Sequence, residues 1–153
     1  MPLRPTLILP LLLILVGCDM VASQSNVKIS QVPANGLTES AFDQGYLQAL
    51  SEETRAAAEQ RLVQAYERNN IPPHERSSHA ETQGRYEKVG NYRLAVIDLS
   101  YNASPMRVKR IVGIAQDQLI TISCISPQGE PLDIHAVEGE CAEAVKGNFR
   151  TSY

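Results

Sequence analysis

The chain has 153 residues and a formal net charge of −3, and 20% of its residues are charged. This mild acidity argues against nucleic-acid binding, which usually requires a basic domain. No internal repeat or low-complexity tract is visible, so the length fits one domain that can bury a sizeable core.

The N-terminus combines one positive charge with a short apolar run. Arg4 precedes the run from Leu7 to Val16, which only Pro10 interrupts. About ten apolar residues are too few for a bilayer-spanning helix, which needs about twenty. A charged start followed by such a run is typical of a secretory signal peptide. The sequence therefore predicts that residues 1–17 are removed on export.

The end of this run, Leu15-Val16-Gly17-Cys18, resembles the lipobox of bacterial lipoproteins at all four positions. The resemblance implies that the Cys18 thiol carries diacylglycerol and that the chain is cut between Gly17 and Cys18. The new N-terminus would usually be acylated too, and two or three acyl chains hold a protein stably at a membrane. Asp19 resembles the inner-membrane retention signal of enteric bacteria, so the inner membrane is favoured and the outer membrane stays open.

The predicted mature chain begins at Cys18 and divides into a tether and one domain. Residues 18–26 are mostly small and polar, which predicts a tether, and residues 27–153 form the domain. Without residues 1–17 the chain keeps thirteen basic and seventeen acidic residues, a formal charge of −4.

The first elements of the domain follow from the spacing of apolar residues. Residues 27–32 alternate apolar and polar side chains, which predicts a strand that ends at Pro33. Apolar spacing within residues 37–50 predicts a short helix that Gly45 weakens.

The main helix is predicted to begin at Ser51. Its hydroxyl can cap backbone amides, and Glu52 and Glu53 suit a first helical turn. The helix ends at Asn69-Asn70, before two prolines. The polar residues 72–84 that follow predict a loop.

Further along, the apolar period changes to two. It predicts strands over residues 92–101, 106–115 and 119–126, and their short connections favour antiparallel hairpins. An amphipathic helix follows over residues 137–150. Its predicted inward residues are Val137, Cys141, Ala144, Val145 and Phe149.

The predicted fold class is α+β, an antiparallel β-meander packed on one face by two helices. This element order is similar to the Mog1/PsbP-like fold found in some bacterial envelope lipoproteins. The similarity spans about residues 50–150, depends on element order without a motif, and implies no function.

Two cysteines remain if the lipid occupies Cys18. Export would place Cys124 and Cys141 in an oxidising compartment, where cysteine pairs tend to form disulfides. Cys124 shares a strand face with Ile120 and Ile122, and Cys141 lies early in the last helix. We therefore predict a Cys124–Cys141 disulfide, with two buried free thiols as the alternative.

The histidines and nucleophiles predict no catalytic or metal site. His74 and His79 flank Glu75 in a stretch that resembles a zinc-protease motif, but that motif needs histidines four apart on one helical face. Here they are five apart and follow two prolines, which favours a solvated loop. His135 is isolated, and no nucleophile-elbow motif is present. The sequence predicts no enzyme, no cofactor and no metal.

One basic cluster stands out. Arg107, Lys109 and Arg110 lie on one predicted strand, and Arg93 lies on the neighbouring predicted strand. The cluster is a candidate anion-binding or partner-binding patch. The sequence favours the other interpretation, a solvated sheet face or edge, where charges prevent unwanted strand pairing.

Together these features predict a non-catalytic lipoprotein of the cell envelope, anchored in the membrane by lipid and facing the periplasm. It would act through contacts with an envelope protein, as an accessory or assembly factor of an envelope complex. One alternative is an inhibitor or immunity-type lipoprotein that blocks an envelope-active enzyme or toxin, and another is an enzyme of unknown class.

Overall fold

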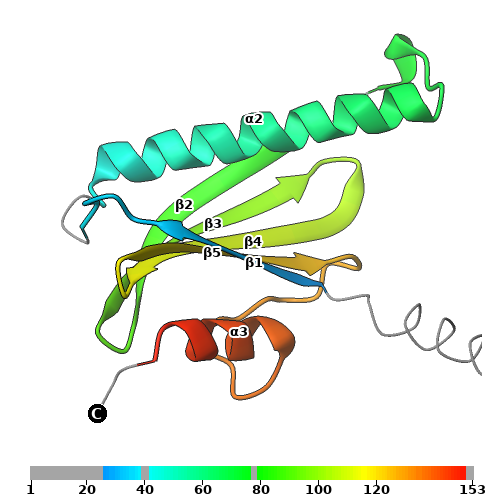
Figure 1. Ribbon diagram of the computed structural model, residues 1–153. Helices are drawn as coiled ribbons and strands as arrows, with labels where there is room; N and C mark the ends of the chain where they lie inside the picture. Colours follow the sequence, from blue (N-terminus) through cyan, green and yellow to red (C-terminus); the bar gives the residue numbers. More distant parts are fainter. Residues whose placement is uncertain (1–25, 39–41, 77–78, 151–153) are drawn as a thin grey trace, which may run out of the picture.

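The computed structural model describes residues 26–38, 42–76 and 79–150 (Figure 1). The predicted signal peptide, Gly17, Cys18 and Asp19 lie outside the described residues. The elements in chain order are β1 (Val27–Pro33), α2 (Gln44–Arg68), a 3-10 turn (Pro73–Glu75), β2 (Ala80–Val89), β3 (Tyr92–Tyr101), β4 (Ser104–Ala115), β5 (Gln118–Ser126) and α3 (Glu140–Asn148).

The five strands form one antiparallel sheet in the order β1-β5-β4-β3-β2. Strands β2 to β5 are a meander, and β1 pairs with β5 at the far edge, from Val27 opposite Cys124 to Pro33 opposite Gln118. The predicted α+β class, with a meander sheet and two helices, is confirmed.

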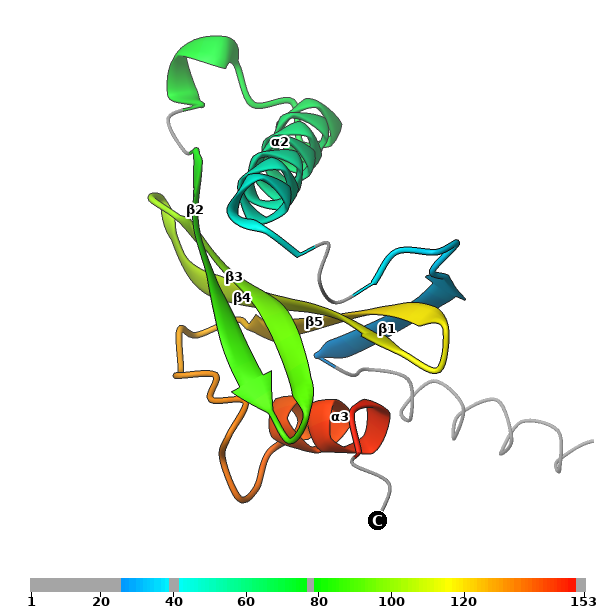
Figure 2. The same ribbon diagram turned by 90° about the vertical axis from the view of Figure 1, so that its left-hand side faces the viewer.

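The two helices cover opposite faces of the sheet, so the prediction that both lie on one face is wrong (Figures 1 and 2). Leu94 and Val96 of β3 pack with α3, whereas Ala95 and Ile97 pack on the α2 side. All four side chains are fully buried. Because β3 carries apolar residues on both faces, each face needs its own cover. We call the two sides the α2 face and the α3 face.

α2 is one helix of 25 residues, so the predicted start at Ser51 is wrong. The Asp43 side chain caps it instead, accepting a hydrogen bond from the Tyr46 backbone amide at 2.8 Å. α2 lies close to β2 at Gly84, where a Cβ atom would come within 2.6 Å of Ser51 Oγ and 3.1 Å of Leu47 Cδ1. The absence of a side chain there permits this close approach.

Strand β2 was missed, because residues 80–84 belong to it rather than to the predicted loop. It is the edge strand opposite β1, and its side chains do not show the apolar alternation of a half-buried strand. Its polar side chains on the α3 face are Glu81, Gln83, Arg85 and Glu87.

The last helix is shorter than predicted. α3 begins at Glu140, after Gly139, whose φ of +118° favours glycine. Val137 therefore precedes the helix and is 87% exposed instead of facing inward. Cys141, Val145 and the flanking Phe149 are buried against the sheet, as predicted.

Candidate functional site

A groove lies between α2 and the half of the sheet that α2 leaves open. α2 packs against β2 and β3, and β5 and β1 lie to one side of it rather than beneath it (Figure 2). The groove has a volume of about 340 Å³, which is within the usual size range of small-ligand sites. We call it the basic groove, and its polar lining residues are Lys28, Ser30, Thr54, Arg61, Tyr101, Arg110, Thr121 and Ser123.

Three cations line the basic groove, and none of its described lining residues is acidic. Lys28 and Arg61 are exposed. Within the described part of the chain, neither they nor Arg110 form an ion pair. Hydroxyl groups on β1 and β5 add uncharged donors. Lysine, arginine and hydroxyl donors together suit an oxyanion.

Arg110 is held in place by a short hydrogen-bond relay from α2. Its Nη1 donates to Thr54 Oγ1 at 3.0 Å, and the Thr54 hydroxyl donates to the Leu50 carbonyl oxygen at 2.7 Å. Arg110 Nε is buried and has no hydrogen-bond partner among the described residues. The relay thus orients a guanidinium that no carboxylate neutralises.

The charges of the groove also act on neighbouring tyrosines. Burial raises the pKa of Tyr101, and the nearby Arg61 guanidinium partly lowers it. Burial likewise raises the pKa of Tyr46, with Glu53 adding to the rise and Arg110 opposing it. Both tyrosines keep their protons at neutral pH, so neither phenol neutralises the groove.

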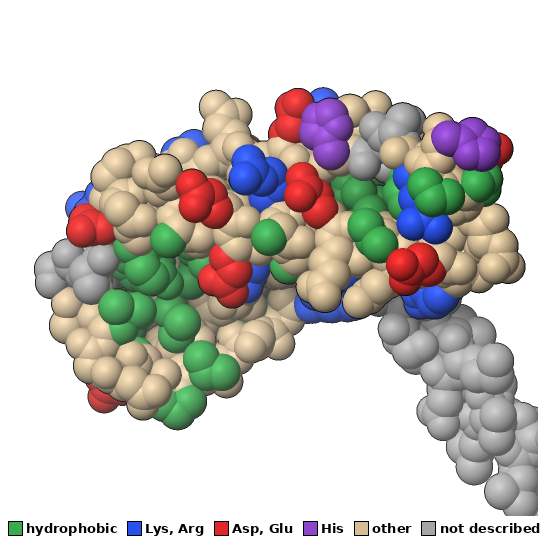
Figure 3. Space-filling view, turned by 90° about the horizontal axis from the view of Figure 1, so that it is seen from above, with side chains coloured by type: hydrophobic (Ala, Val, Ile, Leu, Met, Phe, Trp, Pro, Cys, Tyr) green, Lys and Arg blue, Asp and Glu red, His purple; other side chains and the backbone are tan. Residues whose placement is uncertain are grey.

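The open part of the α2 face changes character along β1. Val32, which is 46% exposed, lies opposite Leu119, and Leu119 lies opposite Ile114. Apolar side chains gather at this end, where α2 begins and β1 ends (Figure 3). The open part of the α2 face is therefore apolar at one end of β1 and basic at the other end, where Lys28 lies.

The outer edge of β1 pairs with no strand among the described residues. At the two ends of the β1–β5 pairing, the Ile125 amide donates to the Asn26 carbonyl oxygen and the Ala34 amide donates to the Asp117 carbonyl oxygen. Backbone groups alternate in direction along an antiparallel strand, so the amides of Ile29 and Gln31 point outward. Pro33 has no backbone N–H group, so the row of outward donors ends before it.

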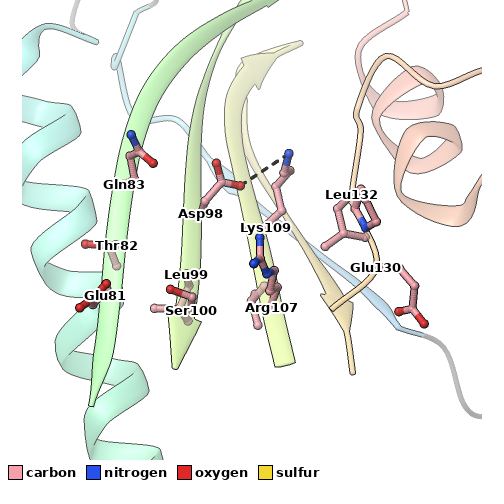
Figure 4. A pocket seen from close by; sticks show the side chains of 12 residues that line it. Glu81, Thr82, Gln83, Asp98, Leu99, Ser100, Arg107, Lys109, Glu130 and Leu132 are labelled. Atoms are coloured by element: carbon pink, nitrogen blue, oxygen red, sulfur yellow. Dashed lines mark ion pairs between the residues drawn. The ribbon is translucent and has the colours of Figure 1, made fainter. Parts of the chain in front are cut away.

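A second cavity, of about 450 Å³, lies on the α3 face near the first turn of α3 (Figure 4). Arg107 and Lys109 of the predicted basic cluster line it, together with Glu81, Asp98 and Glu130. Figure 4 shows these side chains coming from neighbouring strands and from the segment after β5. The cavity mixes both signs of charge, with no excess of cations.

One cation of this second cavity, Lys109, belongs to a chain of ion pairs. Lys109 Nζ lies 3.5 Å from one oxygen of Asp98, and Arg85 pairs with the other oxygen. Arg85 Nε also lies 2.6 Å from Glu87, and the other Glu87 carboxylate oxygen lies 3.1 Å from His135 Nε2. Burial alone would lower the pKa of Arg85, but the bonds to Glu87 and Asp98 together raise it above its ordinary value. Since carboxylates already neutralise this network, we interpret it as structural.

The four residues of the predicted basic patch do not lie together. Arg107 and Lys109 are on the α3 face, whereas Arg110 is in the basic groove. The Arg93 guanidinium lies 3.8 Å from the centre of the Tyr86 ring, in a cation–π contact. The division follows from strand geometry, because neighbours along a strand point to opposite faces. Lys28, Arg61 and Thr54 were missed, although the polar alternation of residues 28 and 30 was a signal for an open face.

The predicted cysteine pair is present, since Cys124 and Cys141 form a disulfide. His74 and His79 make only surface contacts, 3.7 Å to Glu75 and 3.8 Å to Glu81 respectively. Within residues 26–38, 42–76 and 79–150, no cluster of three or more histidine, cysteine or acidic side chains is arranged to hold a metal. No helix in those ranges is long and apolar enough to cross a membrane.

No protein-family model matches the chain, and neither the curated proteins nor the solved structures include a significant match.

Proposed function

We propose that this protein is a lipid-anchored, non-catalytic protein of the bacterial cell envelope that binds a protein of an envelope complex through β1. It acts as an accessory or assembly factor of that complex. The lipobox resemblance at Cys18 supports the anchor. The outer edge of β1, which pairs with no strand among the described residues, supports the contact.

The observation that carries the proposal is the contrast between the two edges of the sheet. Edge strands expose unpaired backbone groups, and proteins usually protect them with charges. β2 has this protection, with four charged side chains between Glu81 and Lys88. β1 has a single charge, Lys28, and two large apolar residues, Ile29 and Val32, that are 49% and 46% exposed.

An unprotected edge of this kind suits binding by strand addition. An extended segment of a partner bonds to the outward backbone groups, and its alternate side chains meet those of the edge strand. On β1 the outward amides of Ile29 and Gln31 would bond to the added strand. The exposed Ile29 and Val32 side chains, on opposite faces, would lose contact with water.

Site-specific photo-crosslinking in native membranes tests the contact. A photoreactive amino acid replaces Ile29 in one variant and Val63 in the control. Val63 is 45% exposed on α2, close to the value for Ile29, so the two sites are matched in exposure. We expect a discrete crosslinked product from position 29 that contains a member of a membrane complex, and none from position 63.

Equal products from both positions would contradict the contact. A product that contains a single soluble enzyme or toxin would instead favour an inhibitor or immunity-type role.

The anchor has its own test, which is mass spectrometry of the protein from its native host. We expect an acylated N-terminal Cys18, and a Cys18→Ser variant that is uncleaved or released from the membrane. Material that still begins with unmodified Met1 would contradict the anchor.

A further inference from the structure

We infer that the basic groove binds carboxylates of an acidic, extended segment of the partner, which at the same time adds to the edge of β1. This inference depends on the proposed strand addition and names what the added strand must carry. The groove and the edge share one strand, since Lys28 and Ser30 of β1 line the groove.

The register of the sheet places an added strand within reach of the groove. Directly opposite side chains on antiparallel strands have Cβ atoms about 5 Å apart. A side chain of the added strand on the α2 face would therefore lie beside Lys28 or Ser30. Behind them lie Thr121 and Ser123 of β5, and then Arg110 of β4. A glutamate at such a position would lie next to the hydroxyl and guanidinium donors of these residues.

The positive charge of the basic groove favours a negatively charged occupant. Three cations without a lining carboxylate favour an anion, and the orientation of Arg110 by Thr54 supplies a planar donor group that fits a carboxylate. On the α3 face, an added strand would meet Val27, Ile29 and Gln31. The partner segment should thus alternate acidic residues, toward the groove, with apolar residues, toward Ile29.

A matched pair of peptides tests this pattern. One is a seven-residue peptide that alternates valine with glutamate, and the other has glutamine in place of each glutamate. Binding of each labelled peptide to the mature lipidated protein, held in phosphatidylcholine nanodiscs, is measured by fluorescence anisotropy. We expect the glutamate peptide to bind about tenfold more tightly, because hydrogen bonds between charged groups are about twice as strong as neutral ones.

Substitutions then show which cations cause the preference for the glutamate peptide. Lys28→Gln and Arg61→Gln alter exposed side chains, and Arg110→Gln alters the oriented guanidinium. Each should reduce the preference for the glutamate peptide, and the effect should shrink at high salt. Arg107→Gln, which removes a cation on the α3 face, is the matched control and should keep the preference.

Each other outcome has a definite meaning. If both peptides bind equally and Ile29→Lys abolishes binding, strand addition stands and the carboxylate site is overturned. If neither peptide binds at millimolar concentration, both proposals fail. If Arg110→Gln instead abolishes binding of the protein to vesicles that contain phosphatidylglycerol, the groove holds a lipid headgroup and the inference is overturned.

Discussion

Cys124 and Cys141 join β5 to the first turn of α3, with their Cα atoms 5.7 Å apart. Cys124 is fully buried, and the bond lies in the core between α3 and the sheet. α3 has nine residues, too few to be stable alone in water. The disulfide therefore ties a short helix to the sheet face that it covers.

Replacing both cysteines with alanine should lower the free energy of unfolding by about 3 kcal/mol, the chain-entropy value for a closed loop of this size. That is a large share of the about 5–15 kcal/mol typical of a whole domain. Urea unfolding of the variant and of the reduced wild-type protein measures the change. An unchanged unfolding midpoint would contradict it, and so would release of the protein from the membrane on reduction, because the predicted thioether at Cys18 is not reducible.

Asp98→Asn should lower the free energy of unfolding by about 1–2 kcal/mol, because it leaves Lys109 without its carboxylate. The Lys109 side chain is only 12% exposed, whereas that of Asp98 is 40% exposed, so water screens part of the interaction. Adding Lys109→Met to Asp98→Asn should restore part of the loss, since it removes the unpaired charge. Urea unfolding of the two variants checks this, and an equal or greater loss in the double variant would contradict it.

Two glycines should respond in opposite ways to alanine. At Gly113 a Cβ atom would come within 2.5 Å of Leu94 Cδ2 and 2.7 Å of Phe149 Cε1, both buried. Gly113→Ala should therefore cost about 1–3 kcal/mol through overpacking. Gly147 lies in α3, and apart from its chain neighbours and the backbone of its own helix no heavy atom lies within 4 Å of its Cβ position. Gly147→Ala should therefore stabilise by about 0.5 kcal/mol. Thermal unfolding separates the two, and a shift of the same sign in both variants would contradict the packing described.

The hydroxyl of Ser126 donates to Glu130 at 2.8 Å and holds the pKa of that carboxyl below its ordinary value of 4.5. The bond favours the charged form, so its stabilising effect is present above pH 4.5 and is lost as the pH falls through the lowered pKa. Ser126→Ala should raise the pKa of Glu130. A carbon-13 NMR titration of the carboxyl group measures it, and an unchanged pKa would contradict the assigned cause.

Much of the fold could be predicted from the sequence because three strands and the cysteine pair carry strong local signals. The period of two in residues 92–101 also assigned Leu94 and Ala95 to opposite faces. The prediction that both helices cover one face was wrong, because an apolar run from Leu94 to Ile97 indicates burial on both faces of the sheet. Helices on opposite faces follow from that run.

The rest could not be predicted because its signals are weak or non-local. β2 is an edge strand with charged side chains, so it lacks the apolar alternation that identifies a strand. The basic groove combines Lys28, Arg61 and Arg110 from three separate elements. Only the pairing of β1 with β5 brings Lys28 to this face beside the other two.

The most direct test of strand addition at β1 is the variant Gln31→Pro in the native host. The substitution removes an amide that points away from β5, so it should leave the sheet pairing, the membrane anchor and the melting temperature nearly unchanged. Thr82→Pro is the control, because the register of β2 with β3 likewise directs the Thr82 amide outward, at the other edge of the sheet. After crosslinking and purification from native membranes, we expect that Gln31→Pro loses the partner protein and that Thr82→Pro keeps it. Full retention of the partner by a folded, membrane-bound Gln31→Pro variant would contradict strand addition at β1.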